Sequence, residues 1–153
     1  MIFRYSIHRK IWELISHADG SIHKEDAAKI LLANSRLTEE EYDALDNSLN
    51  FCTACEYASK MYKDEYERSG VDTGTMCYHC PLEFKGIMEK DSLLKEYAER
   101  QGIVCRCLGG LYDIWYTAIW GWTEGTDPDS PEVMARCAKY IAELNVKNGI
   151  EHI

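Results

Sequence analysis

Proline is scarce in this chain, with three residues among 153, and there is no low-complexity tract. Both features argue against a flexible linker, and the length suits one domain that buries its own hydrophobic core. The chain also lacks a long apolar run, since residues 111–122 are too few to span a bilayer and include Asp113. Near the N-terminus, Arg4, Arg9 and Lys10 interrupt the apolar residues, unlike the core of a signal peptide. We therefore expect one soluble domain, residues 1–153, with no membrane span.

Basic residues are few relative to acidic ones. The chain has 17 Lys and Arg against 26 Asp and Glu, for a formal net charge of −9. Such a surface repels phosphate backbones, so direct binding to DNA or RNA is disfavoured. It would suit a basic partner protein, although a need for solubility also explains the charge.

Cysteine is more informative, because four of the seven cysteines form two Cys-x-x-Cys pairs separated by 21 residues. Each pair can turn two thiolates toward one ion, and two pairs complete a tetrahedron. The odd number of cysteines favours a reducing cytoplasm over a disulfide framework. The pattern predicts a structural Zn²⁺ site whose ligands are Cys52, Cys55, Cys77 and Cys80.

The alternatives for these cysteines are a redox pair and an iron–sulfur cluster, but neither has its usual sequence context here. Four thiolates close the zinc shell and leave no open position for catalysis. His79, inside the second pair, could replace one cysteine as a ligand, although a surface position is the simpler interpretation. Cys105 and Cys107 could supply a further ligand, and ordinary half-buried thiols are again the simpler interpretation.

Helical periodicity recurs along the rest of the chain. Apolar stripes and capping residues predict helices over 5–17, 21–34, 38–46, 56–69, 91–102, 111–122 and 130–147. Nothing in the sequence supplies a set of partner strands. The expected fold is all-α, with a zinc module over 52–80 inserted between N-terminal helices (5–46) and C-terminal helices (91–147).

Two further features are candidate binding surfaces. Residues 36–46 contain five acids and one base, and the acids that we single out are Glu39, Glu40, Glu41 and Asp43. An aromatic tract contains Tyr112, Trp115, Tyr116, Trp120 and Trp122. Tyr and Trp anchor protein interfaces and stack on nucleobases. The alternative for the acidic residues is a solvated helix face, and the alternative for the aromatic tract is a core helix.

Three motifs, taken together and in this order, resemble small uncharacterised proteins encoded by phages and prophages. They are Cys52-Thr53-Ala54-Cys55-Glu56-Tyr57-Ala58, Cys77-Tyr78-His79-Cys80-Pro81-Leu82 and Leu111-Tyr112-Asp113-Ile114-Trp115. The match covers roughly residues 5–116, while the acidic loop 124–129 and the last helix are less typical. The resemblance implies four zinc cysteines and a phage accessory context, without an activity. Proteins of this kind are often non-catalytic inhibitors of host machinery, and the same role is expected here by analogy with that class of protein.

The leading hypothesis is therefore a non-enzymatic phage accessory protein that binds and inhibits a host protein in the host cytoplasm. A defence nuclease or another nucleic-acid-handling protein is the favoured target, because residues 36–46 and loop 124–129 could imitate phosphate charge. The alternative is a small-ligand binder that sequesters a nucleotide signal between the aromatic residues. A zinc-containing nuclease ranks third.

Overall fold

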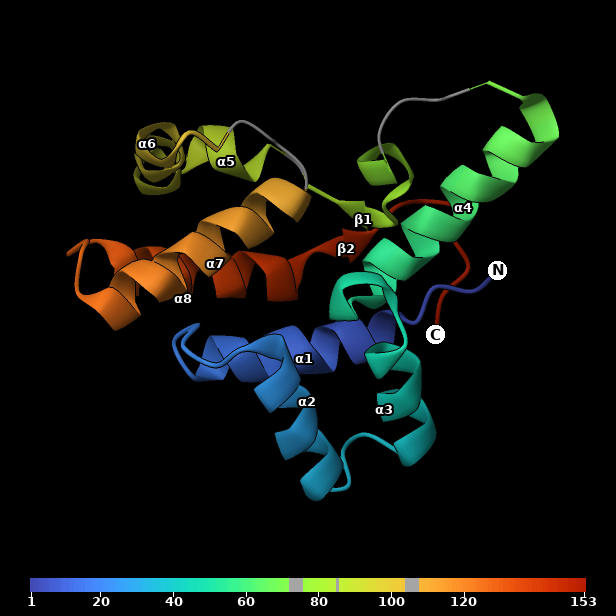
Figure 1. The fold of residues 1–153 in the computed structure, drawn as a ribbon, viewed down its shortest axis with the longest axis horizontal. Helices are drawn as coiled ribbons and strands as arrows, with labels where there is room; N and C mark the ends of the chain where they lie inside the picture. The colour runs from blue at the N-terminus through green and yellow to red at the C-terminus, as the bar shows by residue number, and fades with distance from the viewer. Residues whose placement is uncertain (72–75, 85, 104–107) are drawn as a thin grey trace.

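Helices account for most of the structure in the computed structural model (Figure 1). It describes residues 1–71, 76–84, 86–103 and 108–153, with the backbone alone at 76, 77, 88, 89, 108 and 109. The elements are α1 (Tyr5–His17), α2 (Lys24–Ala33), α3 (Glu39–Asp46), η1 (Leu49–Phe51), α4 (Thr53–Ser69), η2 (Met76–His79), β1 (Leu82–Glu83), α5 (Ile87–Lys90), α6 (Ser92–Gln101), α7 (Leu108–Glu124), α8 (Ser130–Glu143) and β2 (Asn145–Val146). The mainly helical fold in one unit is confirmed. None of the helices within these ranges has the length and apolar content needed to cross a bilayer.

Helix α8 packs against both α7 and α1 (Figure 1). Its buried stripe includes Val133, Cys137 and Ile141, each 0% exposed. The matching stripe of α1 has Ile7, Ile11 and Ile15 at intervals of four residues, as an amphipathic helix requires. Cys137 therefore belongs to the core.

The turn between α1 and α2 brings two distant helices together. Gly20 has φ of +78°, and a Cβ there would lie 2.3 Å from the backbone oxygen of Met134 in α8. The carbonyl of Gly20 accepts a hydrogen bond of 2.7 Å from Nε1 of Trp115 in α7. A glycine is thus required at this turn both by its backbone angles and by the close approach of α8.

Asp91 joins α6 to α8. Its carboxylate caps α6 through the backbone N–H of Leu94, at 3.1 Å. The same carboxylate accepts hydrogen bonds from Arg136 at 3.1 Å and from the hydroxyl of Tyr140 at 2.7 Å. The helix predicted over 91–102 is confirmed, with Asp91 as its N-cap and Gly102 as its C-cap.

Two short strands were not expected from the sequence. β1 pairs antiparallel with β2, with Leu82 opposite Val146 and Glu83 opposite Asn145. The last helix therefore ends at Glu143 and not near 147, because Leu144 adopts extended angles and the chain continues into β2. Beyond β2 the chain returns to the N-terminus, where Phe3 and His152 form a parallel bridge.

Candidate functional site

The first cysteine pair stands where α4 begins. Cys52 is the N-cap of α4, with extended angles of φ −150° and ψ 117°. The backbone N–H of Cys55 donates a hydrogen bond of 3.4 Å to Sγ of Cys52. The Cys-x-x-Cys spacing therefore gives a knuckle in which the helix start points an N–H at the first sulfur and places the second sulfur one turn later.

The residues before this knuckle have an unusual backbone. Asn50 has φ of +56° and Phe51 has φ of +51°, in the left-handed region that bulky residues avoid. Such angles cost of the order of 1–3 kcal/mol each and persist only where surrounding contacts impose them. One such contact is the hydrogen bond of 2.6 Å from Nζ of Lys24 to the carbonyl of Asn50. The chain thus enters the knuckle along a constrained path.

The second cysteine pair overlaps η2, which packs against α4 (Figure 1). Cys80 is 5% exposed and is followed by Pro81, whose carbonyl accepts a hydrogen bond of 2.8 Å from the backbone N–H of Lys147. The β1–β2 pairing starts one residue later, at Leu82. The short sheet therefore anchors the segment that carries Cys80.

Electrostatic coupling connects three of the four predicted ligands. The hydrogen bond that Cys52 and Cys55 share holds the pKa of Cys52 well below its usual range and raises the pKa of Cys55 far above it. Burial of Cys55 and the nearby charges of Cys52 and Cys80 raise its pKa further. A cation bound by both sulfurs would compete with protons for them, so metal binding at this pair would depend on pH.

The structure describes the side chains of three of the four predicted zinc ligands. The side chain of Cys77, together with Cys105 and Cys107, lies outside the described residues. Within the described side chains, no group of three or more His, Cys, Asp or Glu is placed to hold an ion. The four-cysteine zinc site therefore stays a prediction, supported by the knuckle geometry and by thiolate donors that suit zinc.

His79 contacts a side chain on α4. Its Nε2 lies 3.1 Å from Oε2 of Glu65, and its ring lies 6.0 Å from that of Tyr62, centroid to centroid. This polar contact with α4 is a sufficient role for His79.

Two buried basic residues near the knuckle were missed by the sequence analysis. His8 of α1 is 4% exposed and Lys24 of α2 is 5% exposed, and both favour the thiolate form of Cys52. Nζ of Lys24 also lies 4.3 Å from the centroid of the Tyr112 ring. Metal-ligand spacing does not reveal such residues. The one available signal was that His8 lies among the apolar positions of α1, between Ile7 and Ile11.

The aromatic tract divides between the core and the surface. Trp115 is 0% exposed and lies 4.9 Å from Trp12, centroid to centroid. It therefore belongs to the core and is not available for the surface contact expected from the sequence. Tyr112 is half-buried and stacks on Tyr116 at 5.9 Å. Tyr116, Trp120 and Trp122 are exposed, by 40%, 49% and 50%.

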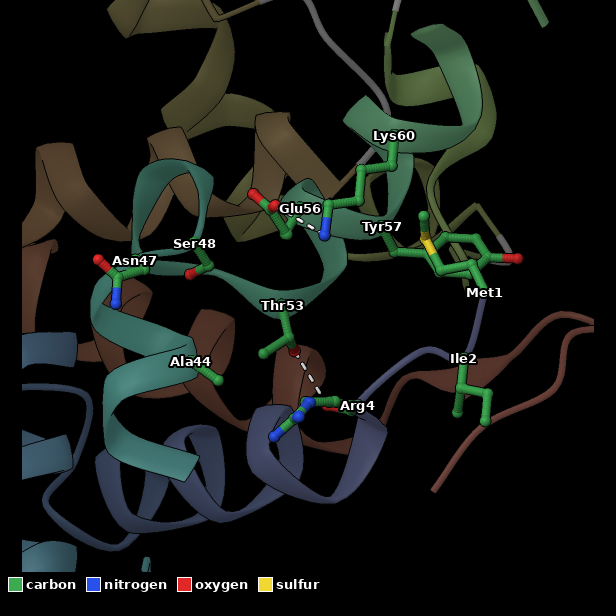
Figure 2. Close-up of a pocket in the computed structure, with 10 residues that line it drawn as sticks. All are labelled: Met1, Ile2, Arg4, Ala44, Asn47, Ser48, Thr53, Glu56, Tyr57 and Lys60. Carbon is green, nitrogen blue, oxygen red and sulfur yellow. Dashed lines mark hydrogen bonds and ion pairs between the residues drawn. The ribbon is translucent and has the colours of Figure 1, made fainter. Parts of the chain in front are cut away.

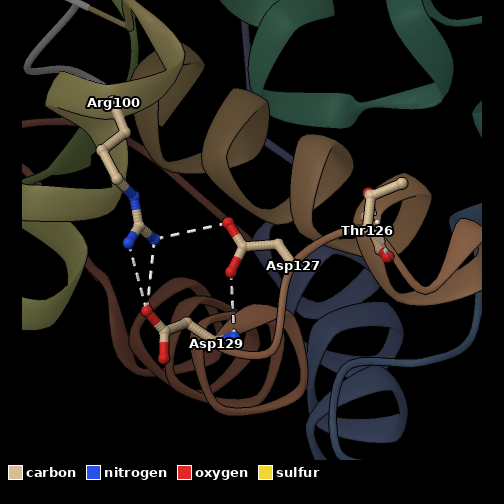
Figure 3. Close-up of polar contacts among 5 residues, drawn as sticks. Arg100, Thr126, Asp127 and Asp129 are labelled. Carbon is tan, nitrogen blue, oxygen red and sulfur yellow. Dashed lines mark hydrogen bonds and ion pairs between the residues drawn. The ribbon is translucent and has the colours of Figure 1, made fainter.

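The predicted acidic surfaces are partly neutralised within the molecule. Glu39, Glu40 and Asp43 are exposed on α3, and Glu41 is half-buried. Glu40 lies 3.1 Å from Arg4, and Glu41 closes the capping box at Thr38. In the loop before α8, Asp127 and Asp129 both pair with Arg100 of α6, at 3.4 and 3.2 Å (Figure 3). The loop therefore presents less free negative charge than its composition indicates.

A cavity of about 270 Å³ lies on the side of α4 that faces α3 and the N-terminus (Figure 2). The two basic side chains that line it, Arg4 and Lys60, both have acidic partners. Arg4 pairs with Glu40, and Lys60 lies 3.3 Å from Glu56. The cavity contains none of the aromatic tract. Among the described residues that line it, the one aromatic side chain is Tyr57 of α4.

No protein-family model, curated protein or solved structure matches this chain.

Proposed function

We propose that this protein is a non-catalytic phage accessory protein that binds and inhibits a basic host protein in the host cytoplasm. The observation that carries the proposal is the exposure of Tyr116, Trp120 and Trp122 on the C-terminal half of α7. Trp and Tyr side chains bury 150–250 Å² each and dominate interface energetics. Tyr116 and Trp120 lie one turn apart, with ring centroids separated by 6.1 Å, and form a surface that a partner protein would cover, while Trp122 extends the exposed aromatic area to another face at the end of the helix.

The charge around this surface favours a basic partner. Glu124 ends α7 directly after Trp122 and Thr123 and is exposed. Lys and Arg side chains of a partner would gain cation–π contacts with the indoles and ion pairs with nearby acids. The net charge of −9 would add long-range attraction, which raises association rates at low salt.

The main contribution of helix α3 would be to this long-range attraction. Glu39 and Asp43 are exposed and, among the described residues, neither has a basic side chain within ion-pair distance. A nucleic-acid-handling protein such as a defence nuclease would present a matching basic groove. This identification of the host target rests on the acidic surface and on the resemblance to phage proteins.

In this proposal Zn²⁺ is structural. Cys52, Cys55, Cys77 and Cys80 would hold it, and the ion would fix α4 against η2. Four thiolate ligands leave no coordination position for a substrate, which supports a binding protein over a zinc-containing nuclease. Structural zinc sites contribute on the order of 10 kcal/mol, enough to determine whether a domain of this size folds.

The test begins with capture of a stoichiometric partner from host lysate, followed by titration calorimetry with the purified partner. We expect the double variant W120A/W122A to weaken binding about 30-fold or more, because each truncated hot-spot residue costs about 1–2 kcal/mol or more. Y66A is the matched control, since Tyr66 is a 51% exposed aromatic residue on a different helix, α4. We expect this control to bind as the wild type does.

Affinity should also fall as salt is raised from about 50 to about 500 mM, because the proposed attraction is electrostatic. Wild-type affinity in W120A/W122A would show that α7 lies outside the interface. Salt-independent binding would show that the acidic residues do not contribute to affinity. Native mass spectrometry of the purified protein addresses the other hypothesis, since a small-ligand binder would carry a co-purified nucleotide.

A further inference from the structure

A tyrosine, an arginine and a carboxylate lie together on α1. Cζ of Arg9 lies 5.8 Å from the centroid of the Tyr5 ring, and Nη2 of the same guanidinium lies 2.8 Å from Oε1 of Glu13. An aromatic ring attracts the delocalised charge of a guanidinium, and a carboxylate accepts hydrogen bonds from its N–H groups. The two contacts are compatible, because a planar guanidinium can stack through its face and donate through its edge.

A second arginine has the same combination of partners. Cζ of Arg100 in α6 lies 5.4 Å from the centroid of the Tyr97 ring. The same side chain pairs with Asp127 and Asp129, at 3.4 and 3.2 Å (Figure 3). The described part of the molecule thus forms this arrangement from its own residues both within α1 and between α6 and the loop before α8.

On α7 the ring and the carboxylate are present without an arginine. Asp113 and Tyr116 are three residues apart, which places their Cβ atoms about 5–6 Å apart on one face of the helix. Both side chains are exposed, that of Tyr116 by 40%. Among the described side chains, no arginine or lysine lies over the Tyr116 ring, and none lies within ion-pair distance of Asp113. Partial burial raises the pKa of Asp113, and a bound cation would offset that effect.

The ring of Tyr116 is held in place by its neighbours. Tyr112 stacks on it, with centroids 5.9 Å apart and planes inclined by 23°. His23, the N-cap of α2, lies 6.4 Å away with its plane inclined by 72°. Trp120, one turn further along α7 and 49% exposed, lies 6.1 Å away and is inclined by 73°. This aromatic stripe is ordered before a partner arrives, which lowers the entropic cost of binding.

We propose that Asp113, Tyr116 and Trp120 form a subsite for an arginine side chain of the basic partner. The guanidinium stacks on Tyr116 and donates hydrogen bonds to Asp113, while Trp120 covers the aliphatic part of the side chain. Arginine suits the site better than lysine, because its planar guanidinium is weakly hydrated, stacks on aromatic rings and binds a carboxylate through two N–H groups. This inference rests on the proposed function, since it names the chemical group that the α7 surface recognises.

The test uses the whole chain, labelled with ¹⁵N at tryptophan, and two capped peptides, tetra-arginine and tetra-lysine, in about 20 mM salt. NMR titration gives the affinity, and the indole N–H resonances give the place of binding. We expect tetra-arginine to bind at least about threefold more tightly than tetra-lysine. It should shift the resonance of Trp120 more than that of Trp122, which lies on another face of α7. Equal affinities for the two peptides, or an unmoved Trp120 resonance, would overturn the proposal.

Matched charge variants test the role of the carboxylate. Asp113→Asn should weaken tetra-arginine binding about 3–5-fold, as expected for loss of an exposed ion pair. Asp113→Glu should keep most of the affinity, because the carboxylate is retained. Asp43→Asn is the control, since it removes the same unit of charge from an exposed residue of α3, and it should bind nearly as the wild type does. Equal losses in Asp113→Asn and Asp43→Asn would show only non-specific attraction and would overturn the subsite.

These outcomes are distinct from those that test the proposed function. Loss of host-partner binding in W120A/W122A, together with equal affinities for the two peptides, would retain the interface and remove the arginine subsite. Wild-type partner affinity in W120A/W122A, together with selective binding of tetra-arginine, would retain a site for arginine and overturn its place in the partner interface.

Discussion

Nε1 of Trp115 donates a hydrogen bond of 2.7 Å to the carbonyl of Gly20, 95 residues away in sequence. The bond connects the middle of α7 to the turn between α1 and α2. The same turn rests against the backbone of α8 at Met134. One glycine therefore receives contacts from both α7 and α8, and substitutions here test the packing directly.

Replacement of Trp115 by Phe should lower the free energy of unfolding by about 2–4 kcal/mol. The substitution shrinks a fully buried side chain and leaves the carbonyl of Gly20 without its donor. Urea denaturation monitored by far-UV circular dichroism measures the change. Trp122→Phe is the control, because Trp122 is half exposed and should change stability by no more than about 0.5 kcal/mol. Equal losses in the two variants would contradict the assignment of Trp115 to the core.

Alanine at Gly20 should be more destabilising than alanine at Gly149. Both glycines have positive φ, +78° and +82°, so the backbone strain of about 1–2 kcal/mol is common to the two variants. Only at Gly20 would the new Cβ meet another backbone, 2.3 Å from the oxygen of Met134. We expect Gly20→Ala to cost about 1–3 kcal/mol more than Gly149→Ala in urea denaturation. Similar midpoints would show that the turn can move away from α8.

Much of the helical architecture could be predicted from local sequence, and the exceptions have physical reasons. The capping box at Thr38, the cap at Asp91 and the glycine end at Gly102 are local signals, and all three are confirmed. The helix expected from Ser21 begins only at Lys24, because His23 is extended. The end of α8 depends on β1, which lies far earlier in the chain, so no local signal could show it.

The candidate site was less accessible to sequence reasoning. The Cys-x-x-Cys spacing correctly brings Cys52 and Cys55 together at one helix start. The approach of His8 and Lys24 depends on how α1 and α2 pack, and a helical apolar stripe does not show which elements it will pack against. The division of the aromatic tract also required the structure, since Trp115 and Tyr116 are neighbours on α7 but differ completely in exposure.

Asp91 should make stability depend on pH. Burial alone would raise its pKa, but hydrogen bonds from Tyr140, the N–H of Leu94 and Arg136 outweigh burial and hold the pKa below its usual value. Its contribution is therefore fully present above the unfolded-state pKa of about 3.9 and is lost as the pH falls through the lower folded-state pKa.

We expect Asp91→Asn to cost about 1–2 kcal/mol at pH 7, because the amide loses the charge-assisted hydrogen bonds. Urea denaturation between about pH 2.5 and 7 should show the wild-type and variant curves converging below about pH 4. A difference that stays constant across this whole range would contradict the lowered pKa.

Loss of one predicted metal ligand should remove zinc and destabilise the fold. Cys80→Ser should contain less than one zinc per chain by elemental analysis and should melt well below the wild type, because metal binding and folding are coupled. Cys137→Ala is the matched control, since Cys137 is a fully buried thiol in the core of α8. It should lose about 1 kcal/mol and retain one zinc. Full zinc content in Cys80→Ser would contradict the ligand assignment.

Helix α4 begins beside the start of α1, and α7 ends at the far side of the molecule (Figure 1). If both proposals hold, Zn²⁺ and the captured partner would bind at opposite ends of one folding unit. Neither could displace the other by competition. Each would nevertheless favour the other's binding through the shared folding equilibrium, so excess partner should slow the loss of metal to a chelator even though it contacts no sulfur.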